Sequence, residues 1–243
     1  MTLMGLHSFH SLTRVKPKEN VPKGFVFLRG LLLCWRIRMS DILYDAAIEY
    51  KKLERTTYRI IVGRKGYSYP IMLHFPPESF FHLAGLQHLT DLTYPSTNKE
   101  RIYKEILEKN FTIKDIQKSI FYDKWFVGER LSSFVYLKDM IEGDSITYLI
   151  NAKRYIAYTA IRADYLCEYK VNYDILYLFL VKEKYHPIFK NEHKGCSMFK
   201  KHAYDYTVGA SKTTTLLVEK EEKGEDKVTI FRNPVYVEER CSI

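Results

Sequence analysis

Apolar and polar residues follow two different periods along the chain, and these periods predict helices and strands. Asp41 can cap a helix over residues 42–50, where apolar side chains recur at helical spacing. Residues 56–62 and 69–75 alternate between apolar and polar positions, as half-buried strands do. The turn at residues 63–66 begins and ends with glycine and joins these segments, which predicts a hairpin.

A further helix is predicted within residues 75–92, and it carries the first candidate for chemistry. Pro76 and Pro77 end the preceding strand and suit a first helical turn, and apolar residues then recur at helical spacing. On this helix His82 is expected to face the protein, and Gly85 leaves room for a backbone or a ligand. Because buried histidines are commonly just hydrogen-bonded core residues, a site and a structural role both stay open for His82.

The middle of the chain is predicted to be mostly helical. Asn98 can cap one helix, and Thr112 with Asp115 forms an approximate capping box for a short second one. A longer amphipathic stretch covers residues 123–140 and ends at a Gly-Asp pair.

The C-terminal part changes character and predicts strands. Residues 173–181 are almost continuously apolar, as in a central strand covered on both faces, whereas residues 182–202 are predicted to form a polar loop. Helices first and strands afterwards predict an α+β fold. In it a helical N-terminal half packs on a C-terminal antiparallel sheet of about four or more strands. The predicted strands of the C-terminal part are residues 147–158, 161–169, 173–181, 203–208, 212–220 and 228–232.

Charge changes this picture little, because most of the basic excess lies at the N-terminus. The 243 residues carry a net charge of +9, from 38 basic and 29 acidic side chains. Residues 1–39 contain seven Lys and Arg and one Glu, which leaves 31 basic and 28 acidic residues, a net charge of +3. Any basic patch for nucleic acid must therefore be local.

Residues 1–39 are predicted to be a basic leader outside the domain, either upstream translated sequence or a locally ordered extension. Their apolar run is too short to span a membrane and lacks a cleavage site of small residues. The pattern changes at Met39-Ser40-Asp41, so residues 40–243 are expected to form a single domain. Four widely spaced cysteines, without a disulfide or zinc-finger pattern, predict a chain of the reducing cytoplasm.

The motifs of P-loop hydrolysis, dinucleotide binding, zinc proteolysis and serine hydrolysis are absent from the sequence. The polar residues of the C-terminal strands and His82 permit another chemistry, the metal-independent cleavage of RNA by its own 2′-hydroxyl. That reaction needs a base, an acid, and donors or cations for the phosphorane. Histidine, tyrosine, threonine and lysine can fill these roles, and tyrosine rings can stack on unpaired bases.

Several segments also match a known pattern in order and spacing: His82–Leu86 after a Pro-bounded strand, Ile161–Leu166, Asp174–Leu180, Cys196–Phe199, Asp205–Thr207 and Thr215–Lys220. Together they resemble a phage-associated nuclease family of the barnase, EndoU, colicin and RelE-like superfamily, in its fourth subgroup. The resemblance covers residues 41 to about 235. It implies helices packed on an antiparallel sheet, RNase activity, and a role as a toxin or host-directed effector of phages or mobile elements.

Two positions depart from the pattern of this family. Met198 stands beside Phe199 where the family has two aromatic residues after Ser197, and Ala210 stands where it has an amide. The departure at Ala210 and the modest charge of residues 40–243 favour an alternative, a catalytically inactive nuclease-fold phage accessory protein that binds a host protein or nucleic acid. A purely structural α+β interaction domain is a further alternative. The expected partners are an RNA substrate, a host protein or a cognate inhibitor, and no membrane.

The chemistry assigns roles to residues within this expected site. His82 is the candidate general base or acid, because it titrates near neutral pH and faces inward. Tyr206, Thr207 and Ser197 are assigned to proton relay or phosphate binding, and Lys220 to positive charge. No metal or cofactor is expected. The candidate substrate-binding residues are Arg162, Lys200, His202, Ser211 and Thr214.

Overall fold

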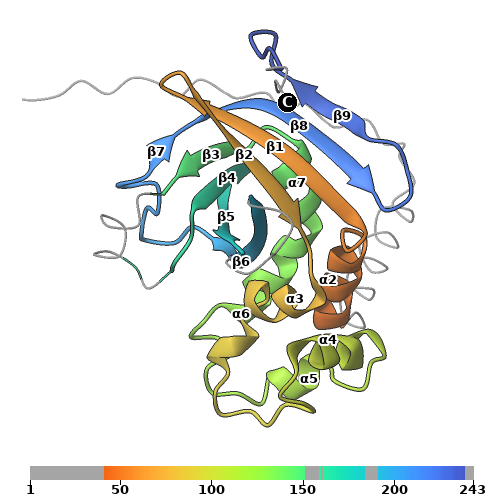
Figure 1. Cartoon of the computed structure of the whole chain (residues 1–243). Helices are drawn as coiled ribbons and strands as arrows, with labels where there is room; N and C mark the ends of the chain where they lie inside the picture. Colours follow the sequence, from red (N-terminus) through yellow and green to blue (C-terminus); the bar gives the residue numbers. More distant parts are fainter. Residues whose placement is uncertain (1–40, 151–158, 160, 184–190, 239–243) are drawn as a thin grey trace, which may run out of the picture. The chain divides into compact units, whose positions relative to one another are not determined.

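The computed structural model describes residues 41–150, 159, 161–183 and 191–238. The expected leader over residues 1–39 lies outside the described residues, as does most of the strand predicted at residues 147–158. Figure 1 shows a curled sheet with most of the helices gathered at one end.

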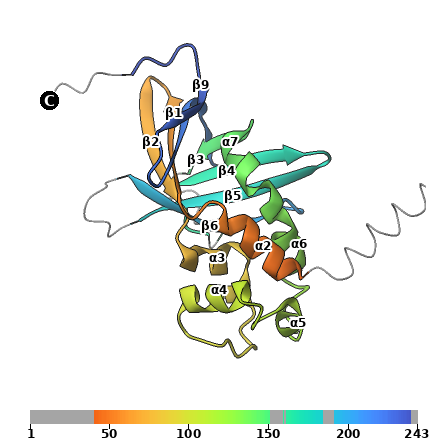
Figure 2. The same ribbon diagram turned by 90° about the vertical axis from the view of Figure 1, so that its right-hand side faces the viewer.

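The helices are short and lie in the first part of the described chain. Figure 2 shows α2 to α6 at the end of the sheet, while α7 lies against β4. The helical elements are α2 (Ile42–Lys51), α3 (Pro77–Leu83), η1 (Leu86–His88), α4 (Lys99–Leu107), α5 (Ile113–Ile116), α6 (Val127–Ser132), η2 (Ser133–Tyr136) and α7 (Leu137–Glu142).

The strands come from both halves of the chain and form one sheet in the order β7-β3-β4-β5-β6-β2-β1-β8-β9. All neighbouring pairs are antiparallel except β2 and β6, which are parallel. The strands are β1 (Thr56–Arg64), β2 (Tyr67–His74), β3 (Ile146–Leu149), β4 (Tyr165–Val171), β5 (Asp174–Lys182), β6 (Glu192–Lys200), β7 (Ser211–Lys212), β8 (Thr214–Glu222) and β9 (Val228–Arg232).

The expected fold class is wrong in its central feature. A helical half does not pack on a separate C-terminal sheet; instead the N-terminal hairpin β1–β2 is inserted between the C-terminal strands β6 and β8. The hairpin itself was expected, and its two-residue turn at Lys65 and Gly66 has φ of 50° and 80°, which matches the twist of paired strands. Local pairing can be read from a sequence, whereas pairing between residues far apart along the chain cannot.

Two predicted segments of the C-terminal part are also wrong. The second half of the expected loop at residues 182–202 forms β6, which pairs with the buried strand β5. Residues 203–208, which were expected to form a strand, form a bend and a turn instead. Charged and small residues give β6 a weak strand pattern, and its neighbours in the sheet override that local preference.

Local capping agrees with the sequence at several helices. The Asp41 carboxylate accepts from the N–H groups of Leu43 and Tyr44, at 3.0 and 3.2 Å, and so caps α2. The same carboxylate accepts from the Ile113 N–H at 3.1 Å, which ties the start of α5 to the start of α2. The expected capping box at Thr112 is present, with Asp115 as its acidic member.

The predicted helix at residues 75–92 is interrupted at Gly85. Helix α3 ends at Leu83, and Gly85 adopts a left-handed conformation with φ 77° before the short η1 begins. Leu83 packs on Gly195 of β6, where an added Cβ would lie 2.9 Å from Leu83 Cδ2. This close approach packs α3 directly against β6.

Two apolar clusters lie on opposite faces of β5, which confirms that this strand is covered on both sides. Leu176, Leu178 and Leu180 belong to the larger cluster, which also contains the helices and β1–β2. Tyr177 and Phe179 belong to the smaller one. The second cluster continues into the aromatic wall of a pocket.

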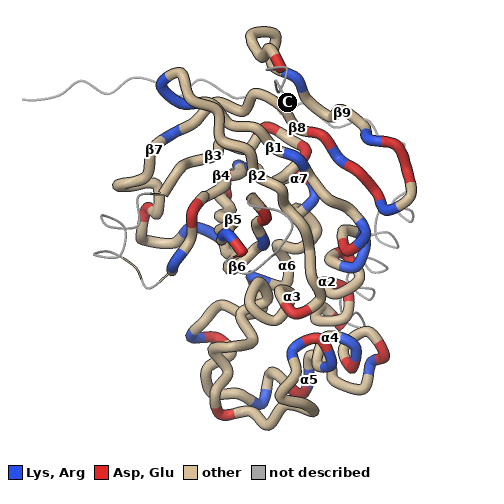
Figure 3. Tube along the Cα trace, in the orientation of Figure 1, with Lys and Arg blue, Asp and Glu red and all other residues tan. Residues whose placement is uncertain are grey.

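No helix among the described residues is long and apolar enough to span a membrane. Basic and acidic residues are interspersed along the described chain, and Figure 3 shows them side by side along β8 and its turn to β9. The local surroundings of each charge, more than the net charge, therefore decide where an anion could bind.

Candidate active site

A pocket of about 410 Å³ opens where η1 and the start of α6 meet the end of β6. Its lining combines a buried arginine, two histidines, a serine and several aromatic rings, a mixture suited to a phosphate and a base. The lining residues that matter for chemistry are His88, Arg130, Ser197, His202 and Tyr206, beside the rings of Trp125 and Phe126.

Arg130 comes from α6, lines this pocket and is only 8% exposed. Its Nε donates to the Trp125 carbonyl at 3.2 Å, and its Nη1 donates to the Met198 carbonyl at 3.1 Å and to Ser197 Oγ at 3.3 Å. The guanidinium also lies over the Phe199 ring, 4.9 Å from its centroid. These contacts hold one edge of the guanidinium fork against β6.

The charge of Arg130 is not neutralised by a carboxylate among the described residues, and its Nη2 donates to none of them. Burial lowers the pKa of Arg130 to about 10, and the group therefore remains protonated at neutral pH. A buried cation without a counterion is costly, and a bound anion would relieve that cost. This is the strongest electrostatic indication of an anion site in the pocket.

His88 also lines this pocket and stacks on Trp125, with ring centroids 4.3 Å apart and an interplanar angle of 15°. Burial, and secondarily the positive charge of Arg130, lowers the pKa of His88 below its usual 6.5. The imidazole is therefore neutral at pH 7. Its Nε2 lies 3.1 Å from the side-chain nitrogen of Gln87.

His202 lies on the segment after β6 and stacks on Phe126, with centroids 4.1 Å apart. Its Nε2 is 3.6 Å from a carboxylate oxygen of Glu129, which would pair with the protonated ring. Phe126 itself has φ 52°, a left-handed conformation that is strained for an aromatic residue. Trp125 and Phe126 thus present two adjacent rings, each against one of the two histidines.

The Asp205-Tyr206-Thr207 segment is a turn whose hydrogen bonds position the tyrosine. The Asp205 carboxylate accepts from the Thr207 hydroxyl at 2.7 Å and from its N–H at 2.9 Å. Lys201, followed by these contacts, holds the pKa of Asp205 well below its usual range. Tyr206 then packs on Phe199 and Phe179 and lines the pocket, while Thr207 bonds to Asp205.

His82, the expected base, is half-buried on α3 but does not line this pocket. Its Nε2 lies 2.8 Å from the ammonium of Lys99. Burial, followed by the positive charges of Lys99 and Lys194, lowers the pKa of His82. Its neutral ring therefore accepts a hydrogen bond from Lys99. In the sequence, His82 precedes Gly85, whereas His88 follows it.

The structure brings Ser197, His202 and Tyr206 together and places the other sequence candidates elsewhere. Lys220 lies on β8, which β2 and β1 separate from β6, and its ammonium is 3.3 Å from Glu222. Lys200 ends β6 and pairs with Asp174 at 2.8 Å. The remaining candidates lie away from the lining: Arg162 precedes β4, Ser211 is in β7 and Thr214 begins β8.

Sequence reasoning missed Arg130 and His88, which the geometry makes the most informative residues of the pocket. Arg130 lies within a predicted amphipathic helix, where an arginine is ordinarily a solvated surface residue. His88 lies six positions after His82 on the same predicted helix, and a continuous helix would have turned the two away from each other. The helix is interrupted at Gly85, so helical spacing does not relate the direction of His88 to that of His82. The glycine itself was the one feature of the sequence that could have indicated this interruption.

Comparison with known protein families identifies the family of this chain. No curated protein and no solved structure matches the chain. A family model described as phage-Barnase-EndoU-ColicinE5/D-RelE like nuclease4 matches residues 42–233 and confirms the resemblance read from the sequence. This match spans all the lining residues discussed above, and membership implies a nucleic acid substrate. The chain belongs to the phage-Barnase-EndoU-ColicinE5/D-RelE like nuclease4 family.

Proposed function

We propose that the protein is an endoribonuclease that cleaves RNA through its own 2′-hydroxyl without a metal, in the pocket around Arg130. The observation that carries this proposal is the buried guanidinium without a carboxylate partner among the described residues, in a pocket that two histidines also line. The nuclease family supports phosphodiester chemistry. The restriction to RNA, the mechanism and a role as a phage or mobile-element effector are our inference.

Arg130 would bind the scissile phosphate. Its Nε and Nη1 are engaged by the protein, so the guanidinium is already oriented before substrate arrives. Nη2 would donate to a phosphate oxygen and stabilise the charge that grows on the phosphorane. Ser197 and Tyr206, both on the pocket lining, would donate their hydroxyl protons to the same group of oxygens.

His88 would act as the general base in place of the sequence candidate His82. It lines the pocket beside Arg130, and its lowered pKa keeps a lone pair available at neutral pH. The Gln87 side-chain oxygen is buried without a hydrogen-bond partner among the described residues. With the amide turned over, that oxygen would accept from His88 Nε2–H and leave Nδ1 to take the 2′-hydroxyl proton.

His202 would act as the general acid that protonates the departing 5′-oxygen. A carboxylate oxygen of Glu129 lies 3.6 Å from Nε2 of this ring and would help to orient it. O2′ then bonds to phosphorus, the bond from phosphorus to O5′ breaks, and a 2′,3′-cyclic phosphate is left on one product. Trp125 and Phe126 offer ring faces for unpaired bases next to the cleaved bond.

A comparison of His88→Ala with His82→Ala tests this assignment against the original one. Purified full-length protein is incubated with total RNA in EDTA, and cleavage is followed over time. We expect wild-type cleavage, a loss of at least about 100-fold in His88→Ala, and a smaller loss in His82→Ala, because general-base catalysis contributes about 10²–10⁴-fold.

The opposite order of the two losses would restore His82 as the base and refute our placement of the site. RNA binding without cleavage by the folded wild-type protein would favour the alternative of an inactive nuclease fold. If the protein neither binds nor cleaves RNA, the alternative of a structural interaction domain is favoured. Circular dichroism of each variant distinguishes lost chemistry from lost folding.

A further inference from the structure

A second cluster of chemically capable side chains lies away from Arg130, where three adjacent strands come together. His74 ends β2, Glu192 begins β6 and Glu183 directly follows β5. One ligand atom from each of the three lies within 4.8 Å of the other two. The pairing of Met72–His74 with Glu192–Lys194 fixes the first two, and the Glu183 N–H donates to the Glu192 carbonyl at 2.8 Å.

The spacing of these atoms suits one metal ion. His74 Nε2 lies 3.0 Å from Glu183 Oε2. Two ligands of a zinc ion at about 2.0–2.2 Å are separated by roughly 3–3.5 Å, so this pair already has the spacing of neighbouring ligands. Glu192 supplies a second carboxylate on the same cluster. One nitrogen and two carboxylate oxygens form a donor set that zinc accepts, with water in the remaining position.

The charges around the cluster allow Glu183 to turn to a metal ion without leaving a cation unpaired. Lys194 lies 2.8 Å from Glu183 Oε1 and 3.6 Å from Glu78 Oε1, so Glu78 can keep this ammonium paired. Lys194 therefore stays within reach of a carboxylate when Glu183 turns toward an ion.

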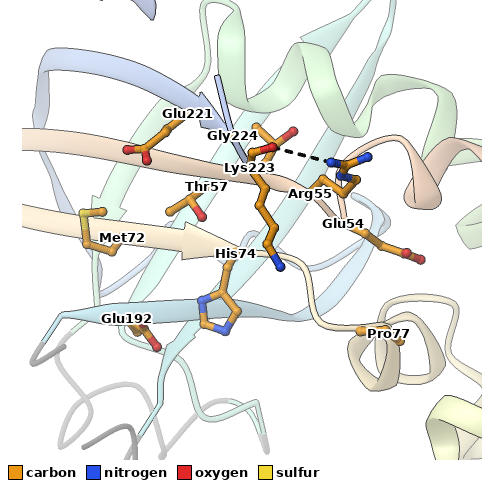
Figure 4. Close-up of a pocket in the computed structure, with 11 residues that line it drawn as sticks. Glu54, Arg55, Thr57, Met72, His74, Pro77, Glu192, Glu221, Lys223 and Gly224 are labelled. Atoms are coloured by element: carbon orange, nitrogen blue, oxygen red, sulfur yellow. Dashed lines mark hydrogen bonds between the residues drawn. The ribbon is translucent and has the colours of Figure 1, made fainter. Parts of the chain in front are cut away.

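The cluster opens on a large pocket, so an ion can reach it from solvent. His74 and Glu192 both line this pocket of about 970 Å³. Figure 4 shows the two side chains on neighbouring strands, with Lys223 and Glu221 from the β8–β9 end of the sheet on the other side of the cavity. This pocket lacks the stacked rings and the buried arginine of the first one, which indicates a different ligand.

We propose that His74, Glu183 and Glu192 bind one divalent zinc ion that fastens β2, β5 and β6 together. This site does not depend on the proposed ribonuclease chemistry, which uses other residues. The ion would act on stability, because all three ligands come from strand ends that meet in the middle of the sheet.

Zinc binding can be measured on the full-length protein without a histidine tag, after treatment with EDTA and removal of the chelator. We expect isothermal titration with ZnCl₂ to give one ion per chain and the melting temperature to rise. His74→Ala and Glu192→Gln are expected to weaken binding at least about tenfold and to abolish the rise. Glu221→Gln, in the same pocket but outside the cluster, is the matched control and should bind zinc as the wild type does.

Two results would overturn the site. One is wild-type protein that does not bind zinc, and the other is binding that persists in both ligand variants. His74→Gln is a second variant if His74→Ala fails to fold. Binding that disappears in His88→Ala instead would place the ion in the first pocket and equally refute the proposal. Cleavage of RNA in EDTA is measured separately, so failure of one proposal does not decide the other.

Discussion

Arg130 keeps its charge at 8% exposure because three protein acceptors and an aromatic ring partly replace water. No carboxylate among the described residues pairs with Arg130, and its side chain lines the pocket. Side chains that are buried at a cost and poorly neutralised are more typical of functional sites than of structural ones.

Arg130→Gln tests this reading of the guanidinium. Gln keeps hydrogen-bonding ability toward β6 but removes the charge and the fork, so we expect cleavage to fall about 10²–10³-fold. Arg130→Lys retains charge and should recover only part of the activity. Initial rates and melting temperatures are measured together. A rate within a few-fold of wild type in a folded Arg130→Gln protein would contradict the role.

The pH dependence of cleavage should report His88. Its pKa is lowered by burial and then by Arg130, so the basic form required for catalysis already dominates at pH 7. The acid limb of kcat/KM should therefore have its midpoint below 6.5 and fall as the ring is protonated. In Arg130→Gln, NMR titration of the His88 ring should show a higher pKa than in wild type. An unchanged or lower value would refute the electrostatic coupling.

At the scale of the element, Gly85 connects the position of His88 to that of Arg130. It adopts φ 77°, and an added Cβ would lie 2.7 Å from Arg130 Cδ. The glycine therefore both ends α3 and leaves room for the arginine side chain. Without it, a continuous helix would direct His88 elsewhere.

Gly85→Ala and Gly66→Ala form a matched pair. Gly66 has a similar φ of 80° but nothing within 4 Å of an added Cβ. Both variants should lose about 1–2 kcal/mol of stability from left-handed strain. Only Gly85→Ala should also displace Arg130 and reduce cleavage, by at least about tenfold. Equal activity of the two variants, measured at a temperature where both are folded, would contradict the link between this turn and the site.

Some elements of the fold could be predicted from the sequence, and others could not. Asp41, the box at Thr112 and the turn at Lys65 act through neighbours in the sequence, so their elements were predictable. Strand β6 was not, because it exists through pairing with β5 and β2. Of the residues that line the site, Ser197, His202 and Tyr206 were predicted from the sequence. Arg130 could not be predicted, because its importance depends on its burial against β6, which the sequence did not predict.

At the scale of the molecule, strands from both ends of the described chain belong to a single sheet. Tyr58 of β1 lies opposite Leu73 of β2 and Lys220 of β8, and its hydroxyl donates to Glu142 at 2.7 Å. The pairing of β1 with β8 joins residues more than a hundred positions apart in the sequence, and contacts of such long range are slow to form.

A fragment of residues 143–243 is therefore expected not to fold alone. It would lack β1 and β2, which lie between β6 and β8, and the helices that cover the larger apolar cluster. Amide NMR spectra should show the narrow dispersion of an unfolded chain. Adding a second fragment, residues 41–142, should restore dispersion if the two halves complement each other. A well-dispersed spectrum from the C-terminal fragment alone would support the separate sheet that the structure contradicts.

The identity of the cleaved strand and of its new ends tests the central claim most directly. RNA and DNA single strands of the same sequence are incubated with the full-length protein in EDTA, and the products are analysed by mass spectrometry. We predict that only the RNA is cut and that its fragments end in 2′,3′-cyclic phosphates. Cleavage of the DNA, or RNA fragments that carry 5′-phosphates, would contradict it.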